Sequence, residues 1–165
     1  MHKTVRHDPD AFDLRILALY QDDVRVTAET IGERVGLSAA AVQRRLKRMR
    51  EAGVIEAEIA QVSPASVGYP LSCIVSVDID RETAADLDRF KARMLACAEV
   101  QQCYYVTGVA DFILVVLVAD MLAFEAFTRA QLLADANVRS FTTHVVMEPV
   151  KVGLQVPLNG SLRSA

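Results

Sequence analysis

Five basic side chains gather in a short stretch of the sequence that contains no acidic residue. Between Ser38 and Arg50 the cations are Arg44, Arg45, Lys47, Arg48 and Arg50. Guanidinium and ammonium groups bind polyanions, and arginine presents paired N–H donors that match a phosphate or the edge of guanine. The whole chain is mildly acidic, with 18 Lys and Arg against 21 Asp and Glu. A polyanionic partner is therefore expected only at this local cluster.

The residue types that carry catalysis or bind metal form no recognisable group. We find no nucleophile with a base, no paired acids and no glycine-rich phosphate loop, so we expect no catalytic residue, no cofactor and no metal. His144 stands alone in a strand-like segment, where histidine is more often structural than a metal ligand. The cysteines lack zinc-ligand spacing, and we interpret Cys73, Cys97 and Cys103 as packing residues in a reducing compartment.

Targeting and membrane signals are also lacking. No apolar run approaches the ~20 residues that a membrane helix needs. Residues 1–10 are too polar and too charged for a signal peptide. We therefore expect a soluble cytoplasmic protein without a membrane partner.

The basic cluster falls on the last of three predicted helices. The first helix covers residues 13–20, and Thr27 begins a second that Gly36 ends in the left-handed conformation that glycine alone adopts without penalty. Ser38 begins a third helix over residues 39–52. The short Gly36-Leu37-Ser38 connection predicts a helix-turn-helix, whose second helix enters the major groove of duplex DNA.

The third helix has two different faces. Val42, Leu46 and Met49 fall on one side at helical spacing, while most of the cations point the opposite way. A charged face is often only solvated, but its place on the second helix of a helix-turn-helix favours DNA. We expect the helix start to bind a phosphate, Arg44 and Gln43 to contact bases, and the other cations to hold phosphates. The predicted DNA contacts are Thr27, Ser38, Ala39, Ala40, Gln43, Arg44, Arg45, Lys47 and Arg48.

The remainder of the chain predicts a second, α+β domain. Residues 54–60 alternate as a short strand, and a Pro- and Ser-containing stretch follows as a linker. Beyond it, period-two and helical patterns alternate in the order βαββαβ, a ferredoxin-like unit. The predicted strands are 71–80, 100–107, 111–118 and 138–146, and the helices are 84–98 and 123–134. We therefore predict an N-terminal winged helix-turn-helix domain at 1–60, a linker at 61–70, a ferredoxin-like domain at 71–152 and a tail at 153–165.

The third strand of this domain predicts a partner. Residues 112–118 are apolar without interruption, so both faces of the strand favour burial. Two helices cover only one face of a four-stranded sheet. A second copy of the same sheet is the simplest cover for the other face, and we expect a homodimer.

Both halves resemble the Lrp/AsnC family, the feast/famine transcription regulators. In the first half the similar stretches are 13–17, 34–38, 44–48 and 53–55. In the second half they are 106–108, 111–112, 120–121 and 145–148. The resemblance covers residues 10–152. It departs from the family at Val24, where a glycine is usual, and at Val109 and Ala110, where acidic or aromatic residues are common.

The resemblance implies a regulator that binds double-stranded DNA and responds to an amino-acid-like effector. It also implies a homodimer with higher assembly, such as a tetramer of dimers, and an effector pocket between subunits. Backbone amides near Gly108 suit a carboxylate, and Asp111 suits an α-ammonium group. Val109 and Ala110 favour an apolar amino acid. The implied effector residues are Thr107, Gly108, Val109, Ala110, Asp111, Met121, His144, Val145 and Val146.

Three other interpretations stay open at this point. The 107–111 loop is also compatible with a plain hairpin. Sirohaem decarboxylases, which are tetrapyrrole enzymes, resemble the same two-domain family, and His144 would be the residue available for such a role. A sensor or scaffold acting through the C-terminal half alone is the third. The intact basic helix argues against the last two.

Overall fold

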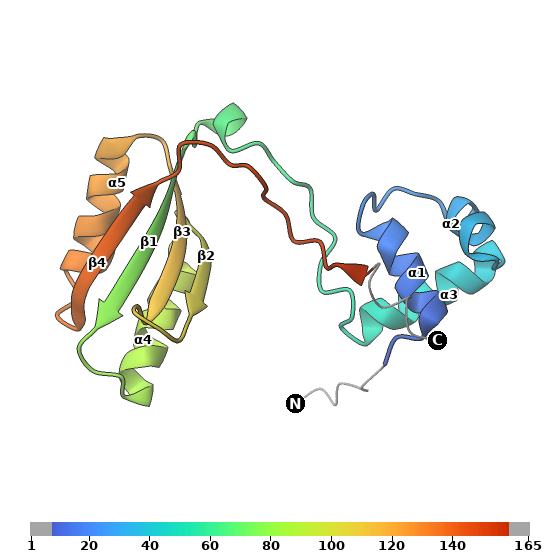
Figure 1. The fold of residues 1–165 in the computed structure, drawn as a ribbon, viewed down its shortest axis with the longest axis horizontal. Coiled ribbons are helices and arrows are strands. Elements are labelled where there is room, and N and C mark those ends of the chain that lie inside the picture. The colour runs from blue at the N-terminus through green and yellow to red at the C-terminus, as the bar shows by residue number, and fades with distance from the viewer. Residues whose placement is uncertain (1–7, 159–165) are drawn as a thin grey trace. The chain divides into compact units, whose positions relative to one another are not determined.

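The computed structural model describes residues 8–158. These residues form two compact units, each of which is clear in Figure 1. One unit contains the described residues up to Ala60 together with those from Lys151 onward, and the other is Gln61–Val150. The C-terminal segment is tied to the first unit, because the Gln21 side chain donates to the Val156 carbonyl and accepts from the Val156 amide, at 3.0 Å each.

The first unit is built from α1 (Ala11–Tyr20), α2 (Ala28–Val35) and α3 (Ala39–Glu51). As predicted, Thr27 and Ser38 are N-caps, and their hydroxyls accept backbone N–H groups of the first turns. Gly36 ends α2 with φ of 77°. Helix α1 begins earlier than predicted, because the Asp10 carboxylate accepts from the amides of Phe12 and Asp13 and caps the helix.

The core of this unit comes from all three helices. It contains Ile16, Tyr20, Ile31, Val35, Val42, Leu46 and Met49. The predicted apolar face of α3 is thus confirmed as buried. Its opposite face stays exposed, which fixes the direction in which the basic side chains project.

The predicted strand at residues 54–60 is wrong. No strand occurs among residues 8–60 of the part that the structure describes. A lone extended segment has no neighbour to satisfy its backbone hydrogen bonds. Side chains hold the segment instead: the Glu58 carboxylate accepts from the Tyr20 hydroxyl at 2.9 Å and from Arg50 Nε at 2.6 Å.

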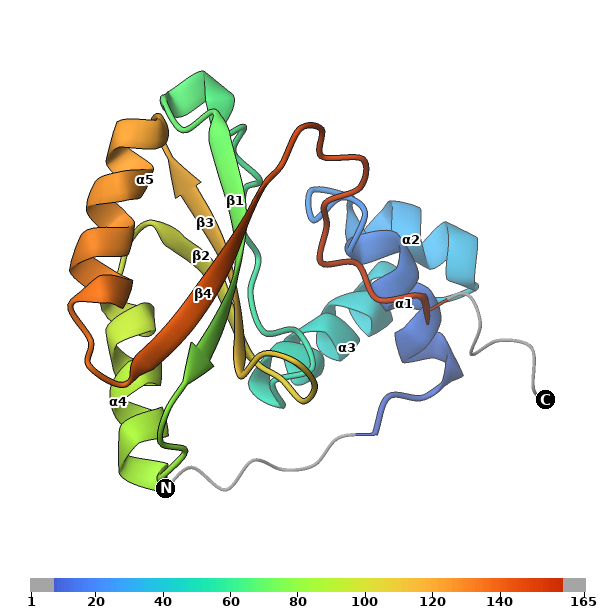
Figure 2. The same ribbon diagram turned by 60° about the vertical axis from the view of Figure 1, so that its left-hand side comes forward.

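The second unit is the predicted ferredoxin-like sheet. Its strands are β1 (Leu71–Ile79), β2 (Val100–Tyr105), β3 (Phe112–Val118) and β4 (Val138–Val145). All pairings are antiparallel in the order β2-β3-β1-β4. Helices α4 (Ala84–Ala96) and α5 (Met121–Thr128) cover the same face of the sheet, as Figures 1 and 2 show. Helix α5 starts two residues earlier than predicted because Asp120 caps it, and it continues as a π-helical turn at Arg129–Leu133.

The two faces of the sheet differ in burial. On the helix side, alternate residues of β1 and β3 are fully buried against Phe90, Met94 and Phe127. The opposite face carries Ile74, Tyr104, Ile113, Val115 and Leu117, which are half-buried or exposed. No helix of this unit covers these side chains. An apolar surface of this kind marks an interaction site.

Candidate nucleic-acid interface and effector site

The start of α3 presents polar groups to solvent. The Ser38 hydroxyl accepts from the Ala41 amide at 3.3 Å, and Ser38, Ala40 and Gln43 are exposed. The first N–H groups of a helix have no partner within the helix, and the helix dipole adds positive potential. This end of α3 therefore suits an anion. Thr27, at the start of α2, is likewise exposed, and its hydroxyl lies 3.1 Å from that of Thr30.

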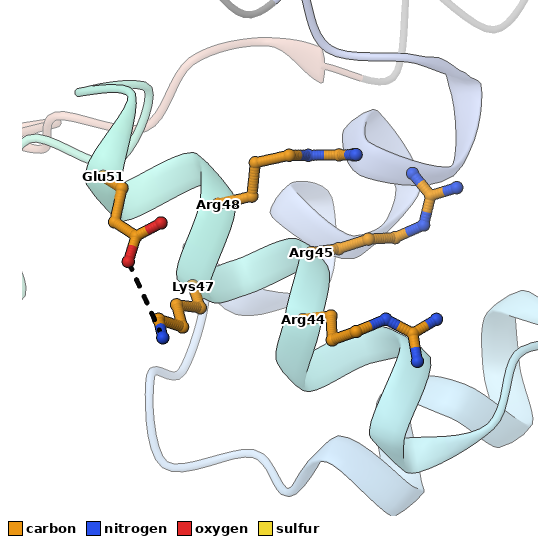
Figure 3. Close-up of a pocket in the computed structure, with 5 residues that line it drawn as sticks. All are labelled: Arg44, Arg45, Lys47, Arg48 and Glu51. Atoms are coloured by element: carbon orange, nitrogen blue, oxygen red, sulfur yellow. Dashed lines mark ion pairs between the residues drawn. The ribbon is translucent and has the colours of Figure 1, made fainter.

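A shallow hollow with a basic lining lies on the exposed side of α3. Arg44, Arg45, Lys47, Arg48 and Glu51 form it (Figure 3). The structure thus brings together four of the five cations that were predicted to contact DNA, all except Arg50. The partners of these four side chains separate them into two pairs.

Arg45 and Arg48 are bound to helix α1. Arg45 Nη1 lies 2.6 Å from Asp10 Oδ2 and 2.8 Å from Asp13 Oδ1, and Arg48 Nη2 donates to both Asp13 oxygens at 3.1 and 3.3 Å. Asp13 is completely buried. The hydrogen bond from Arg45 holds the pKa of Asp10 below its ordinary value. These two arginines therefore hold α3 against α1, with part of their charge neutralised.

Of the four cations that line the hollow, Arg44 and Lys47 have the fewest partners among the described residues. Arg44 has no hydrogen-bond or ion-pair partner within residues 8–158. Lys47 lies 3.8 Å from Glu51, and both side chains are largely exposed. Arg50, which was expected to hold a phosphate, instead bonds Glu58 and the Tyr20 hydroxyl, which raises its pKa.

Asp10 and Asp13 hold two arginines of α3, a positioning role that sequence reasoning missed. Their spacing fits a capping box, which the structure contains. The cap alone does not predict the contact with Arg45, more than thirty positions away in the sequence. Only the packing of α1 on α3 shows it.

The loop between β2 and β3 carries the first group of predicted effector residues. Gly108 has φ of 127°, and Thr107 and Val109 are exposed. Asp111 is half-buried, and its Oδ2 accepts from the Ile79 amide at 2.7 Å. That bond uses one carboxylate oxygen and fixes the orientation of the side chain. The other oxygen has no hydrogen-bond partner among the described residues and suits an ammonium group.

The second group lies at the opposite end of the sheet. Val145 pairs with Cys73 near the start of β1, whereas the β2–β3 loop joins β3 where Phe112 pairs with Val77. Met121 follows the far end of β3 and is exposed, as are His144 and Val145. At about 3.3 Å per residue, the two ends lie about 20 Å apart. One chain therefore does not bring the predicted effector residues together.

The sequence also predicted no metal site, packing roles for the cysteines and no membrane helix. Among residues 8–158 no group of three or more His, Cys, Asp or Glu side chains is arranged to hold a metal ion. Cys73 and Cys97 are buried and Cys103 is half-buried, and burial raises the pKa of all three thiols. No helix in the described part of the chain combines the length and apolarity needed to span a membrane.

Comparison with known proteins covers both units. Residues 9–56 match the winged helix-turn-helix DNA-binding domain model, and residues 72–156 match the Lrp/AsnC ligand binding domain. An HTH-type transcriptional regulator of Sinorhizobium fredii is 46% identical over 90% of this chain and 88% of its own length. The leucine-responsive regulatory protein of Rhizobium meliloti is 34% identical over 93% and 99%.

Solved structures agree with these matches. An AsnC family transcriptional regulator from Agrobacterium tumefaciens superposes with a TM-score of 0.85 at 29% identity, covering 92% of this chain and 98% of that one. A transcriptional regulator from Neisseria meningitidis, solved as a complex with L-methionine, gives the same TM-score and coverage at 32% identity.

The fold and the basic helix thus define a helix-turn-helix regulator with a ligand-binding domain. The chain belongs to the Lrp/AsnC family of transcription regulators. The relatives and structures reported above are named as transcriptional regulators, so the tetrapyrrole-enzyme alternative receives no support.

Proposed function

We propose that this regulator acts in the cytoplasm as a dimer that reads duplex DNA with α3 and changes its assembly or DNA affinity when an amino acid binds. The main observation in support of the DNA-binding surface is the difference between the two sides of α3. One side is buried in the unit's core. From the other side Arg44 projects without a partner in the described chain, and Lys47 has only its exposed 3.8 Å ion pair with Glu51.

Each side chain at this surface has a role that follows from its surroundings. Ser38, Ala39 and Ala40 form the helix start, whose amides suit a phosphate. Arg44 presents paired donors to guanine, and Gln43 pairs with adenine. Lys47 holds a phosphate as a point charge. Arg45 and Arg48 keep α3 in position and offer their remaining N–H groups to the backbone of the DNA.

DNA binding by the full chain tests this surface. We expect Arg44→Ala/Lys47→Ala to weaken binding to random duplex and to flatten the dependence of log affinity on log salt by about one unit per lost phosphate contact. Arg89→Ala/Arg139→Ala is the matched control, because it removes the same charge from the other unit. Unchanged affinity and salt slope in the α3 variant would show that this surface does not contact DNA.

The open face of the sheet supports the dimer. Ile74, Val115 and Leu117 lie on the face that neither helix of the second unit covers. A second copy of this face buries the apolar side chains of both copies at once, across a two-fold axis. A dimer also presents two α3 helices, which suits a pseudo-palindromic site.

The separation of the predicted effector residues into two distant groups supports a site between two copies of the chain. The loop at residues 107–111 supplies a fixed carboxylate and exposed backbone, while Met121 and His144–Val146 lie about 20 Å away in the same chain. A pocket that uses both groups must therefore take them from two chains. The neighbour solved with L-methionine supports an apolar amino acid as the first candidate.

Calorimetric titration with each common amino acid, methionine first, tests the effector. We expect one apolar amino acid to release or take up heat and to raise the unfolding temperature. Asp111→Asn keeps an oxygen for the Ile79 amide but removes the charge, so we expect it to weaken binding about tenfold or more. Asp88→Asn, at an exposed site on α4, should bind like wild type. If no amino acid gave a heat of binding or shifted the unfolding temperature, the proposal of an amino acid effector would be refuted.

A further inference from the structure

The C-terminal segment, residues 151–158, follows the sheet of the second unit in the sequence but belongs to the first unit. Its apolar side chains are mostly in solvent: Leu154 is 73% exposed and Val156 is 59% exposed. Burial of apolar surface therefore contributes little to the position of this segment. Hydrogen bonds have the larger part in holding it.

These hydrogen bonds are made at the end of α1. The side-chain amide of Gln21 uses both of its ends, since Nε2 donates to the Val156 carbonyl and Oε1 accepts from the Val156 N–H. This pair of bonds resembles the exchange between two opposite residues in an antiparallel sheet. The next residue, Asp22, accepts from Gln155 Nε2 at 2.9 Å. Two consecutive residues of the first unit thus bind both the backbone and a side chain of the C-terminal segment.

The other connection between the units is held at the same place. Glu58, three residues before the second unit begins, accepts from the Tyr20 hydroxyl and from Arg50 of α3. The chain therefore passes between the units twice, and the consecutive residues 20–22 hold the chain at both passages. One flexible connection leaves a unit free to take many orientations, and a second connection reduces that freedom.

We propose that Gln21 and Asp22 form a docking site for this chain's own C-terminal segment, and that the docked segment restricts the orientation of α3 on DNA. The return connection is short, because only residues 146–150 separate the end of β4 from the segment. The last residue of β4, Val145, is among the predicted effector residues. The proposal rests on the proposed function, since orientation matters when a dimer places two α3 helices on two half-sites at once.

Binding to duplexes with altered half-site spacing tests the proposal. The probe is a two-half-site duplex that wild type selects from random sequences, lengthened at its centre by one to five base pairs, each of which rotates one half-site by about 35°. We expect two added base pairs to weaken binding by wild type about tenfold or more. Gln21→Ala, and a chain that ends at Gly153, should lose less than about threefold, because their α3 helices can follow the rotated half-site.

A duplex with a single half-site supplies the reference for each variant. All variants should bind it within about twofold of wild type, because the contacts of α3 are unchanged. The response to spacing is a ratio within one variant, so a general loss of affinity does not alter it. Gln101→Ala, at an exposed glutamine of β2, and a chain that ends at Leu158 are the matched controls and should respond to spacing like wild type.

Two results overturn the proposal. One is that Gln21→Ala and the chain ending at Gly153 respond to spacing as steeply as wild type, and the other is that wild type accepts all spacings equally. A wild type that binds no duplex overturns the proposed function, and this proposal with it.

Discussion

Asp13 is a residue on which the position of α3 depends. Its carboxylate is completely buried and accepts from Arg45, Arg48 and the Asp10 amide. A buried carboxylate without charged partners would cost several kcal/mol, and the two arginines offset that cost. The interaction orients α3 and stabilises the first unit through the same contacts.

We expect Asp13→Asn to lower the free energy of unfolding of the full chain by about 2–3 kcal/mol, because two arginines lose a charged acceptor. Urea denaturation followed by circular dichroism measures the change. Asp88→Asn, at a mostly exposed position, is the control and should stay within about 0.5 kcal/mol of wild type. Equal stability of both variants would contradict a structural role for Asp13.

Glu58 predicts a pH dependence. Hydrogen bonds from Arg50 and from the Tyr20 hydroxyl lower the pKa of this carboxyl. A lowered pKa in the folded state means that the ionised group stabilises the protein at neutral pH. This contribution is lost as the pH falls below the ordinary pKa of 4.5 and through the lowered pKa. Protonation of Asp10, whose pKa is also lowered, adds to this loss of stability at acid pH.

Glu58→Gln removes this titration, so its stability should fall less steeply than that of wild type below pH 4.5. Urea midpoints collected between neutral and acid pH measure the two slopes. Glu56→Gln, at an exposed neighbour with no hydrogen bond or ion pair among the described residues, serves as the control and should follow wild type. Parallel curves for wild type and Glu58→Gln would rule out the contribution of this group.

At the level of elements, the turn between α2 and α3 depends on two glycines for different reasons. Gly36 has φ of 77°, a conformation that strains other residues. Gly32 lies inside α2, and a Cβ atom there would lie 2.4 Å from the Leu37 carbonyl oxygen. The Gly32 carbonyl also accepts from the amides of Gly36 and Leu37. The turn thus folds back closely on the helix that precedes it.

We expect Gly32→Ala to destabilise the protein by about 1–3 kcal/mol, although alanine favours helices, because the turn must move away from the new methyl group. Thermal unfolding of the full chain measures the loss. Gly153→Ala is the matched control, since a Cβ there meets nothing within 4 Å. A neutral or stabilising Gly32→Ala would mean that the turn yields without cost.

Local signals predicted most element boundaries. The caps Thr27 and Ser38 and the stop at Gly36 act through neighbouring backbone groups, so they can be found in a short window of sequence. The predicted strand at residues 54–60 was wrong for the opposite reason. Its alternation is compatible with a strand, but a strand requires a neighbour, and the described first unit has none.

For the molecule as a whole, the open face of the sheet predicts the assembly. Val115 lies in the middle of β3 on that face, opposite Ile74 of β1. We expect Val115→Asp to convert the proposed dimer to monomer, because it places charges in an apolar interface on both copies. Light scattering gives the mass directly. Val24→Asp adds the same charge at an exposed site of the first unit, and its mass should equal that of wild type.

A monomer should also bind a two-half-site duplex more weakly, since each chain then contributes a single reading helix. This loss differs from that of the α3 variants, which change the contact itself. A Val115→Asp protein that remains dimeric would place the interface elsewhere on the chain.

The sequence by itself determined the caps, the amphipathic faces, the order of strands along the chain and the basic character of α3. These features depend on residues close together in the chain, and their physical causes act over one or two turns. Resemblance then provided the family and the candidate effector residues. Only the tertiary structure decided which cations stay free, because the partners of Arg45 and Arg48 lie on another helix. It likewise decided that the predicted effector residues separate to opposite ends of the sheet, since strand register is set by long-range pairing.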